Sequence, residues 1–378
     1  MIWMLVVPLL VLAAELGLRR WYHRDRYFVW QPHTRLMIRP DPVTHPQLEP
    51  LVRWQVNAEG ERGSPAPRSG RVYRILAAGG SAVECFLLDQ STQWPGRLEL
   101  LLQRPECLRA VGADRVHCGS IGRSSVGSES LDLMLTHVLA QPGKIDAIIL
   151  MVGATDVLAW LEIGAPSDRP ASPRPVSELF DRHPEVQFRW SPHGLALTHL
   201  ARHLLARRTV PTNGAARWMG RARAMRGRAT TMIDLLPPST TMLNHFERNL
   251  TSLIQRCQAR ADRVLVIGQP WFDRDHYSAE EEALLWNGGV GKAYKDEVTV
   301  YYSNRIIRAL MTELHERTRK VSTGLRAEFV DVMSGLTGGP PVYIDHFHFT
   351  PDGSARVAAL VERQLLQPTD LRPGTDRP

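Results

Sequence analysis

Short apolar runs alternate with amphipathic stretches along the chain from Val72 onward. The apolar runs read VYRILAA, RVHC, IDAIILMV, RVLVIG and AEFVDV. Between them, stretches such as SESLDLMLTHVL and LNHFERNLTSLIQRCQ repeat apolar residues at helical spacing. Continuous apolar strands that are joined through helices are typical of a parallel sheet covered on both faces. The pattern therefore predicts a three-layer α/β/α domain with five parallel strands, closed by a helix that begins at Pro351.

Two segments depart from this rhythm. Residues 19–70 are rich in Pro, Gly and Arg and are interpreted as a juxtamembrane connector with one strand at LVRWQV. Residues 160–240 are interpreted as an insertion within a domain that spans 71–367, and 368–378 as a flexible tail. The insertion carries eight arginines and no acidic residue between Ala201 and Ala229. Its stretch GLALTHLARHLLARR is either a basic amphipathic helix for a membrane surface or an anionic glycan, or a solvated cap helix.

The N-terminal stretch 1–18 is apolar apart from Glu15. We interpret it as an uncleaved transmembrane anchor at the short limit of length. A signal peptide cleaved after Ala13 and a buried helix of the domain are the alternatives. The aromatic residues that would lie at the interface are Trp21, Tyr22 and Tyr27. The basic flank after the helix favours a cytoplasmic domain, whereas the enzyme class argued below favours an extracytoplasmic one, so the side stays open.

Composition narrows the class of protein. The chain has 378 residues, 43% of them hydrophobic and 22% charged, which excludes bulk disorder. The net charge of +7 indicates an anionic neighbour such as a membrane surface or an anionic polymer. No nucleic-acid-binding module accompanies the arginines, so no nucleic acid is predicted. The cysteines lack metal-ligand spacing, and we favour four buried thiols over a Cys107–Cys118 bridge.

Polar and glycine residues follow the predicted strands at the points where they end. Gly79-Gly80-Ser81 follows the first strand, GSIGRSS the second and VGATDV the third, and YIDHFHFTPDG precedes the last helix. Because ligands bind outside the carboxyl ends of the strands in such sheets, these segments are expected to converge on one edge.

The spacing of Asp345 and His348 suits a turn in which the carboxylate accepts a hydrogen bond from the imidazole Nδ1–H. The Nε2 atom would then be free to take a proton from Ser81, as nucleophilic acyl transfer requires. The alternatives are an ordinary turn at Ser81, a helix-entry cluster at Asp345 and His348, or a metal site that includes His346. No further ligand accompanies these three residues, so neither a metal nor a cofactor is predicted.

These segments together resemble the SGNH (GDSL-like) hydrolase superfamily. ILAAGGSAVEC is similar to its serine block, HCGSIGRSS to its glycine block, VGATDV stands in the place of the G-x-N-D block, and DHFHFTPDG matches the D-x-x-H block. VNAEGERG, before the first strand, resembles membrane-anchored bacterial members. The resemblance implies a flavodoxin-like sheet and Ser81, Asp345 and His348 as catalytic residues. It implies an oxyanion hole formed by Ser81, Gly122 and Thr155, with Gly119 as a second match.

The function implied by the resemblance is a serine esterase that removes or transfers an O-acyl group, on a small molecule or on an envelope glycan or polysaccharide. Thr155 stands where the family has an asparagine whose amide donates to the oxyanion, and a hydroxyl is a shorter donor. The alternative is therefore a weak or inactive glycan-binding or scaffold protein on the same fold. Trp271 and Trp286 are either sugar-stacking platforms or core residues.

Overall fold

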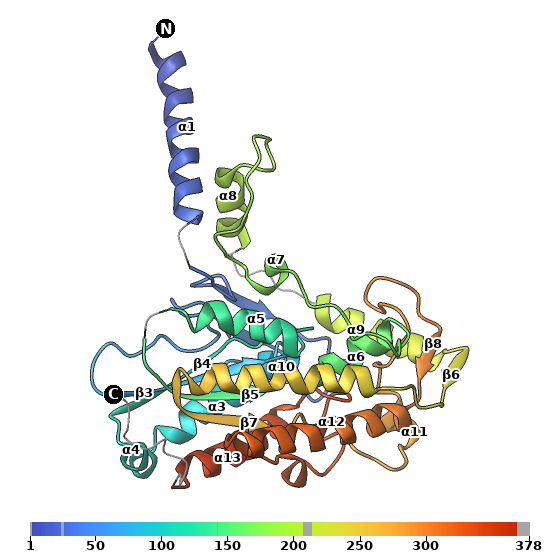
Figure 1. Cartoon of the computed structure of the whole chain (residues 1–378). Coiled ribbons are helices and arrows are strands. Elements are labelled where there is room, and N and C mark those ends of the chain that lie inside the picture. The colour runs from blue at the N-terminus through green and yellow to red at the C-terminus, as the bar shows by residue number, and fades with distance from the viewer. Residues whose placement is uncertain (1, 24–25, 142, 207–213, 369–378) are drawn as a thin grey trace.

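A sheet of five parallel strands lies at the centre of the computed structural model, which describes residues 2–23, 26–141, 143–206 and 214–368 (Figure 1). The strands lie in the order β4-β3-β5-β7-β9. Their bounds are β3 Val72–Gly79, β4 Arg115–Ser120, β5 Ile145–Met151, β7 Ala261–Ile267 and β9 Glu328–Val330. All five predicted apolar runs are strands, and their order confirms the predicted flavodoxin-like sheet.

Helices cover both faces of this sheet, which confirms the three predicted layers. Successive residues of a strand point to opposite faces, so Ile148 and Ile149 of β5 belong to two different apolar cores. The first core is closed by α5 (Ser128–Val138), α6 (Ala154–Glu162), α10 (Thr240–Gln258) and α12 (Asn304–Gly324). The second is closed by α3 (Trp94–Leu102) and α13 (Pro351–Leu366), which pack against each other. The remaining short elements of this domain are α2 Ser81–Glu84, α4 Pro105–Val111, α11 Ala279–Glu282 and the 3-10 helix Met333–Gly335.

The connector folds back onto the domain. Strand β1 (Arg35–Ile38), which was not predicted, pairs antiparallel with β2 (Val52–Gln55), the strand predicted in LVRWQV. The side chains of Ile38 and Trp54 in these strands are buried. The connector therefore contributes to the second core.

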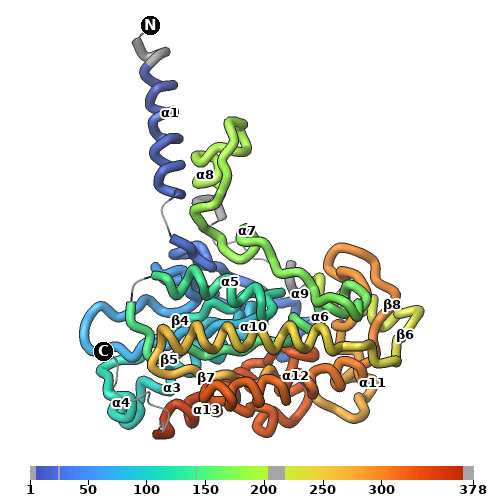
Figure 2. Tube along the Cα trace, viewed as in Figure 1, coloured from blue at the N-terminus to red at the C-terminus, as the bar shows by residue number. Residues whose placement is uncertain are grey.

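The insertion contains α7 (Val176–Leu179), α8 (Ala196–Ala206), α9 (Gly214–Gly227) and β6 (Thr231–Ile233). Strand β6 pairs in parallel with β8 (Val300–Tyr302), and neither strand was predicted. Figure 2 shows that the insertion leaves the domain as far as α8 and returns to it at α9. The predicted basic helix corresponds to α8, although its last two residues, 207 and 208, lie outside the described residues, as does the predicted tail from 369.

The N-terminal helix α1 (Ile2–Tyr22) extends away from the α/β domain with α8 beside it (Figure 1). In the part of the chain that the structure describes, no helix combines the length and the apolar character that crossing a membrane requires. The transmembrane anchor predicted at 1–18 is therefore not supported. The one charge in its apolar stretch has protein partners, because the buried Glu15 carboxylate accepts hydrogen bonds from the backbone N–H groups of Ala196 and Leu197 at 2.9 and 3.0 Å. Glu15 thus caps the start of α8.

The four cysteines are buried free thiols, as we favoured from the sequence. The alternative bridge between Cys107 and Cys118 is not formed.

Candidate active site

The first candidate residue, Ser81, lies at the carboxyl edge of the sheet, where β3 ends at Gly79 and α2 begins. A Cβ atom on Gly79 would lie 2.0 Å from the carbonyl oxygen of Met151 on the neighbouring strand, so only glycine fits there. Gly80 follows in an extended conformation and is the N-cap of α2. The two glycines therefore let the strand pass close to β5 and place Ser81 in the first turn of the helix.

Ser81, His348 and Asp345 form one chain of hydrogen bonds. The Nε2 atom of His348 lies 2.8 Å from the Ser81 Oγ atom, although 267 positions separate the two residues in the sequence. The Nδ1 atom of His348 lies 2.7 and 2.9 Å from the two carboxylate oxygens of Asp345. The structure thus brings together the three residues that the sequence singled out as catalytic candidates, at hydrogen-bonding distances suited to proton transfer.

The Asp345 carboxylate is fully buried and accepts hydrogen bonds from four groups. Besides His348 Nδ1, it accepts the backbone N–H groups of Phe347 at 2.9 Å and His348 at 3.0 Å, and the indole Nε1–H of Trp286 at 2.6 Å. Burial alone would raise the pKa of this carboxyl, but the charge of His348 and these hydrogen bonds lower it below its ordinary value. For His348 the signs are reversed. Burial alone would lower the pKa of its imidazole, but the negative charge of Asp345 and the hydrogen bond to it raise that pKa above its ordinary value. Asp345 therefore stays ionised and orients the ring.

The backbone N–H groups of Ser81 and Gly122 are two of the three candidate donors for an oxyanion hole. Among the described residues, the N–H of Ser81 has no hydrogen-bond acceptor, so it is free to receive a developing negative charge. Gly122 packs so closely on α2 that a Cβ there would lie 2.2 Å from the backbone nitrogen of Glu84. Its own N–H donates a long bond of 3.3 Å to the Ser120 hydroxyl. An oxyanion would have to draw that N–H away from Ser120. Gly119, the second match, instead packs against the Glu61 carboxylate.

Thr155 and Asp156 lie in the first turn of α6, near the same edge. A Cβ on Gly80 would lie 3.6 Å from the Thr155 Oγ1 atom, so this hydroxyl faces the backbone just before Ser81. The carboxylate of Asp156 accepts the Ser128 N–H at 3.0 Å and its hydroxyl at 2.5 Å. Burial raises the pKa of Asp156 to about 6. Asp156 therefore ties α6 to the start of α5, and Thr155 is the member of the pair that reaches the site.

Glu84 and Arg62 are two buried charged residues at the end of α2 for which the sequence indicated no role. The buried Glu84 carboxylate accepts the N–H and the hydroxyl of Ser124, in the loop that carries Gly122. The buried guanidinium of Arg62 donates to the carbonyl oxygens of Cys85 at 2.9 Å and Leu88 at 2.6 Å, and also to that of Glu84. Arg62 is the arginine of the VNAEGERG motif, and this motif was the only feature of the sequence that pointed to Arg62. Together these contacts fix the end of α2 against the loop that carries Gly122 and Ser124, which we call the oxyanion loop.

The geometry does not favour the alternative of a metal site at Asp345, His346 and His348. His346 is buried, with its two ring nitrogens 3.2 Å from Asn287 Oδ1 and 3.1 Å from Asn304 Oδ1. Because His348 faces Ser81 and Asp345 instead, the three candidate ligands do not converge on a common point.

The two candidate tryptophans differ in their surroundings. Trp271 is buried in the first core beside His315, so it is a core residue. Trp286 is half-buried, and its ring lies parallel to the His348 ring with centroids 6.4 Å apart. Trp286 is thus a neighbour of the site, whereas the sequence had left it as either a sugar-stacking platform or a core residue.

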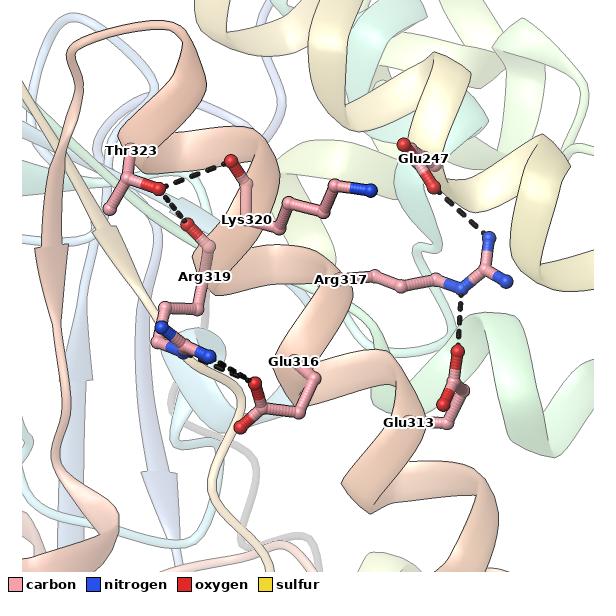
Figure 3. A pocket seen from close by; sticks show the side chains of 7 residues that line it. All are labelled: Glu247, Glu313, Glu316, Arg317, Arg319, Lys320 and Thr323. Carbon is pink, nitrogen blue, oxygen red and sulfur yellow. Dashed lines mark hydrogen bonds and ion pairs between the residues drawn. The ribbon is translucent and has the colours of Figure 1, made fainter.

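A depression in the surface between α10 and α12 lies apart from this site (Figure 3). None of the triad or oxyanion candidates lines it. Its Arg317 pairs with Glu247 at 3.0 Å and with Glu313 at 2.9 Å, and its Arg319 pairs with Glu316. Both arginines and all three glutamates of the lining are therefore engaged in ion pairs.

No protein-family model and no curated protein matches the chain. Solved structures that resemble it include the acetylxylan esterase Axe2 from Geobacillus stearothermophilus, with 13% identity, a TM-score of 0.42, and 78% of this chain and 94% of that one covered. A lipolytic protein of the G-D-S-L family from Veillonella parvula has 9% identity, a TM-score of 0.41 and coverages of 77% and 97%. LAE5, an alpha/beta hydrolase from the metagenome of Lake Arreo in Spain, has 12% identity and a TM-score of 0.41, with 78% and 97% covered. Because these values are low, we base the chemistry on the chain's own residues.

Proposed function

We propose that the protein is a serine esterase of the SGNH type that cleaves O-acyl esters. The observation that supports this most strongly is the hydrogen-bonded chain from Ser81 through His348 to Asp345. A hydroxyl, an imidazole and a buried carboxylate in that order are the groups that activate a serine nucleophile.

In the acylation step, Ser81 Oγ attacks the ester carbonyl while His348 Nε2 takes its proton. Asp345 keeps the imidazole in the tautomer with Nδ1 protonated and stabilises the imidazolium that forms. The carbonyl oxygen becomes an oxyanion, which accepts hydrogen bonds from the N–H groups of Ser81 and Gly122, with the Thr155 hydroxyl as a third donor. His348 then gives its proton to the leaving alcohol, and an acyl-serine remains.

In the second step, water attacks the acyl-serine while His348 removes its proton, and His348 returns this proton to Ser81 Oγ as the bond to the acyl group breaks and the carboxylic acid leaves. A sugar hydroxyl in place of water would make the same site an acyltransferase. The half-buried ring of Trp286 beside His348 suits a sugar face, so acylated glycans are the substrates that we would test after simple esters.

A fluorophosphonate probe tests the proposal, because it labels only an activated serine. We expect the wild-type chain to be labelled and Ser81→Ala and His348→Ala not to be. Ser69→Ala, which removes an exposed hydroxyl, serves as the matched control and should label fully. Absence of labelling in a folded wild-type protein would overturn the proposal.

A glycan-binding or scaffold protein with weak or no activity is the second candidate. Two observations favour it, namely the threonine in place of a side-chain amide and the Gly122 N–H that is held by Ser120. Glycan binding that survives in Ser81→Ala, together with an unlabelled wild type, would support this candidate.

A further inference from the structure

Helix α9 brings two arginines of the insertion into the domain. Arg223 and Arg226 lie three positions apart and therefore on one face of the helix. Arg226 is 7% exposed and Arg223 is half-buried, whereas Arg221 on the same helix and Arg228 just after its end are exposed. Among the described residues, neither of the two inward arginines forms a salt bridge. Their donors are directed at backbone and amide oxygens instead.

The guanidinium of Arg223 joins three separate segments. Its Nη2 donates to the carbonyl oxygen of Ile344 at 2.9 Å, its Nη1 to that of Thr44 at 2.6 Å, and its Nε to that of Leu284 at 3.0 Å. Ile344 immediately precedes Asp345. Arg223 therefore fixes the backbone on the N-terminal side of the catalytic carboxylate against the connector.

Arg226 acts on the other side of Asp345. Its Nη1 donates to the carbonyl oxygen of Asn287 at 2.6 Å, and its Nη2 to the side-chain oxygen of Asn304 at 2.6 Å. The side-chain oxygens of these two asparagines flank the ring of His346, the residue that follows Asp345. Arg226 thus orders the groups that hold the C-terminal side of the carboxylate.

The same pair also brackets Trp286, the indole donor to Asp345. Arg223 binds the carbonyl of Leu284 and Arg226 that of Asn287, so the two contacts lie on either side of Trp286 in the chain. Trp218 of α9 packs edge-on against the Trp286 ring, with centroids 4.8 Å apart. One helix therefore holds both partners of the hydrogen bond between Trp286 and Asp345.

We propose that Arg223 and Arg226 are positioning residues, through which the insertion helix α9 holds Asp345 and Trp286 in the geometry that orients His348. The inward arginines of the insertion then serve the reaction rather than an anionic surface. This inference rests on the proposed esterase function, since its consequence is a loss of turnover.

The test uses the full chain with Arg223→Gln and Arg226→Gln, and Arg221→Gln as the exposed control on the same helix. We expect kcat on a p-nitrophenyl ester to fall by on the order of 10- to 100-fold in the first two variants, because small displacements of catalytic groups have large effects. KM and the control should change little. Arg223→Lys, which keeps the charge but cannot reach three carbonyls, should recover only part of kcat. Thermal melts check that each variant is folded.

A second readout does not depend on turnover. The proton between His348 Nδ1 and Asp345 should give a far-downfield NMR signal that is absent in Asp345→Ala. We expect Arg221→Gln to keep this signal, and Arg223→Gln and Arg226→Gln to lose or broaden it. If the two inward variants keep both the signal and kcat, the positioning role is overturned while the esterase function stands. If the wild type proves inactive yet the signal depends on Arg223 and Arg226, the esterase proposal fails and the positioning role is retained.

Discussion

Trp286 donates its indole N–H to the Oδ2 atom of Asp345 over 2.6 Å. The carboxylate also accepts two backbone N–H groups, so it is fixed from three directions before it binds His348. An orienting carboxylate that is held in this way cannot rotate away from the imidazole. The rate of the proposed reaction therefore depends on Trp286 as well as on Ser81, His348 and Asp345.

Replacing Trp286 by phenylalanine keeps an aromatic ring and removes the N–H donor. A hydrogen bond to a charged group contributes about 1.5–3 kcal/mol, so we expect kcat to fall roughly tenfold or more with little change in KM. Steady-state kinetics on a p-nitrophenyl ester measure this. Trp190→Phe, which makes the same change at an exposed tryptophan away from the site, is the control. Equal kcat values for Trp286→Phe and wild type would argue against the role of the indole.

The pH dependence of kcat/KM should report the protonation of His348. Only the neutral imidazole can accept the serine proton, so activity should rise with pH through the pKa of His348. Asp345 and, at longer range, Glu84 raise this pKa above its ordinary value of 6.5, against burial and the opposing charge of Arg223. We therefore expect a midpoint above 6.5 for the wild type. Asp345→Asn should move the midpoint down as well as lower the rate, and a midpoint that does not move would contradict the assignment.

Much of the site could be predicted because it follows from the order of the strands. The carboxyl ends of parallel strands share an edge, so a serine after β3 and a D-x-x-H turn before α13 are expected to lie near each other. The contacts of Trp286, Arg223 and Arg226 could not be predicted in this way. They lie in the insertion or in irregular segments, where no periodicity relates a residue to its distant partner.

The N-terminus shows the opposite case, because the described structure does not support the membrane anchor that its apolar pattern predicted. Hydropathy alone indicated a membrane span, whereas Glu15 uses its carboxylate to cap α8. That partner lies about 180 positions away, at the start of a helix that the sequence did indicate, but no sequence pattern relates the two helices to each other. The compartment in which the domain works stays a prediction.

His117 on β4 should make the stability of the fold depend on pH. The buried ring lies 3.6 Å from the Glu61 carboxylate and 3.5 Å from that of Glu99. Burial opposes the charged ring, but the two carboxylates raise the pKa of His117 to about 9 from 6.5. Because the folded-state pKa is the higher one, this stabilisation is complete below pH 6.5 and is lost as the pH rises through about 9.

Chemical denaturation at several pH values measures this contribution. We expect wild type to exceed His117→Gln in unfolding free energy by on the order of 1–3 kcal/mol at neutral pH. The difference should shrink above the folded-state pKa. A difference that is constant across this range would show that His117 is not charged in the folded protein.

Gly122→Ala should affect both stability and labelling. The added Cβ would lie 2.2 Å from the backbone nitrogen of Glu84 and 2.5 Å from the carbonyl carbon of Val83, and backbone atoms cannot give way as a side chain does. Overpacking of this kind costs about 1–3 kcal/mol, and here it also pushes α2 away from the oxyanion loop. Gly324→Ala, where nothing lies within 4 Å of the new atom, is the control. Thermal melts and fluorophosphonate labelling rates that match the control would contradict the close packing.

Thr155→Asn tests whether the hydroxyl stands in for an amide donor. The Oγ1 atom of Thr155 faces the backbone at Gly80, where a longer amide would reach further toward an oxyanion above Ser81. An oxyanion-hole donor contributes on the order of a hundredfold or more in rate, so even a partial gain should raise turnover about tenfold. Thr155→Val, which keeps the shape but has no donor, should lower it. Turnover of a small acyl ester that is unchanged or lower in Thr155→Asn, with the fold intact, would remove Thr155 from the oxyanion hole.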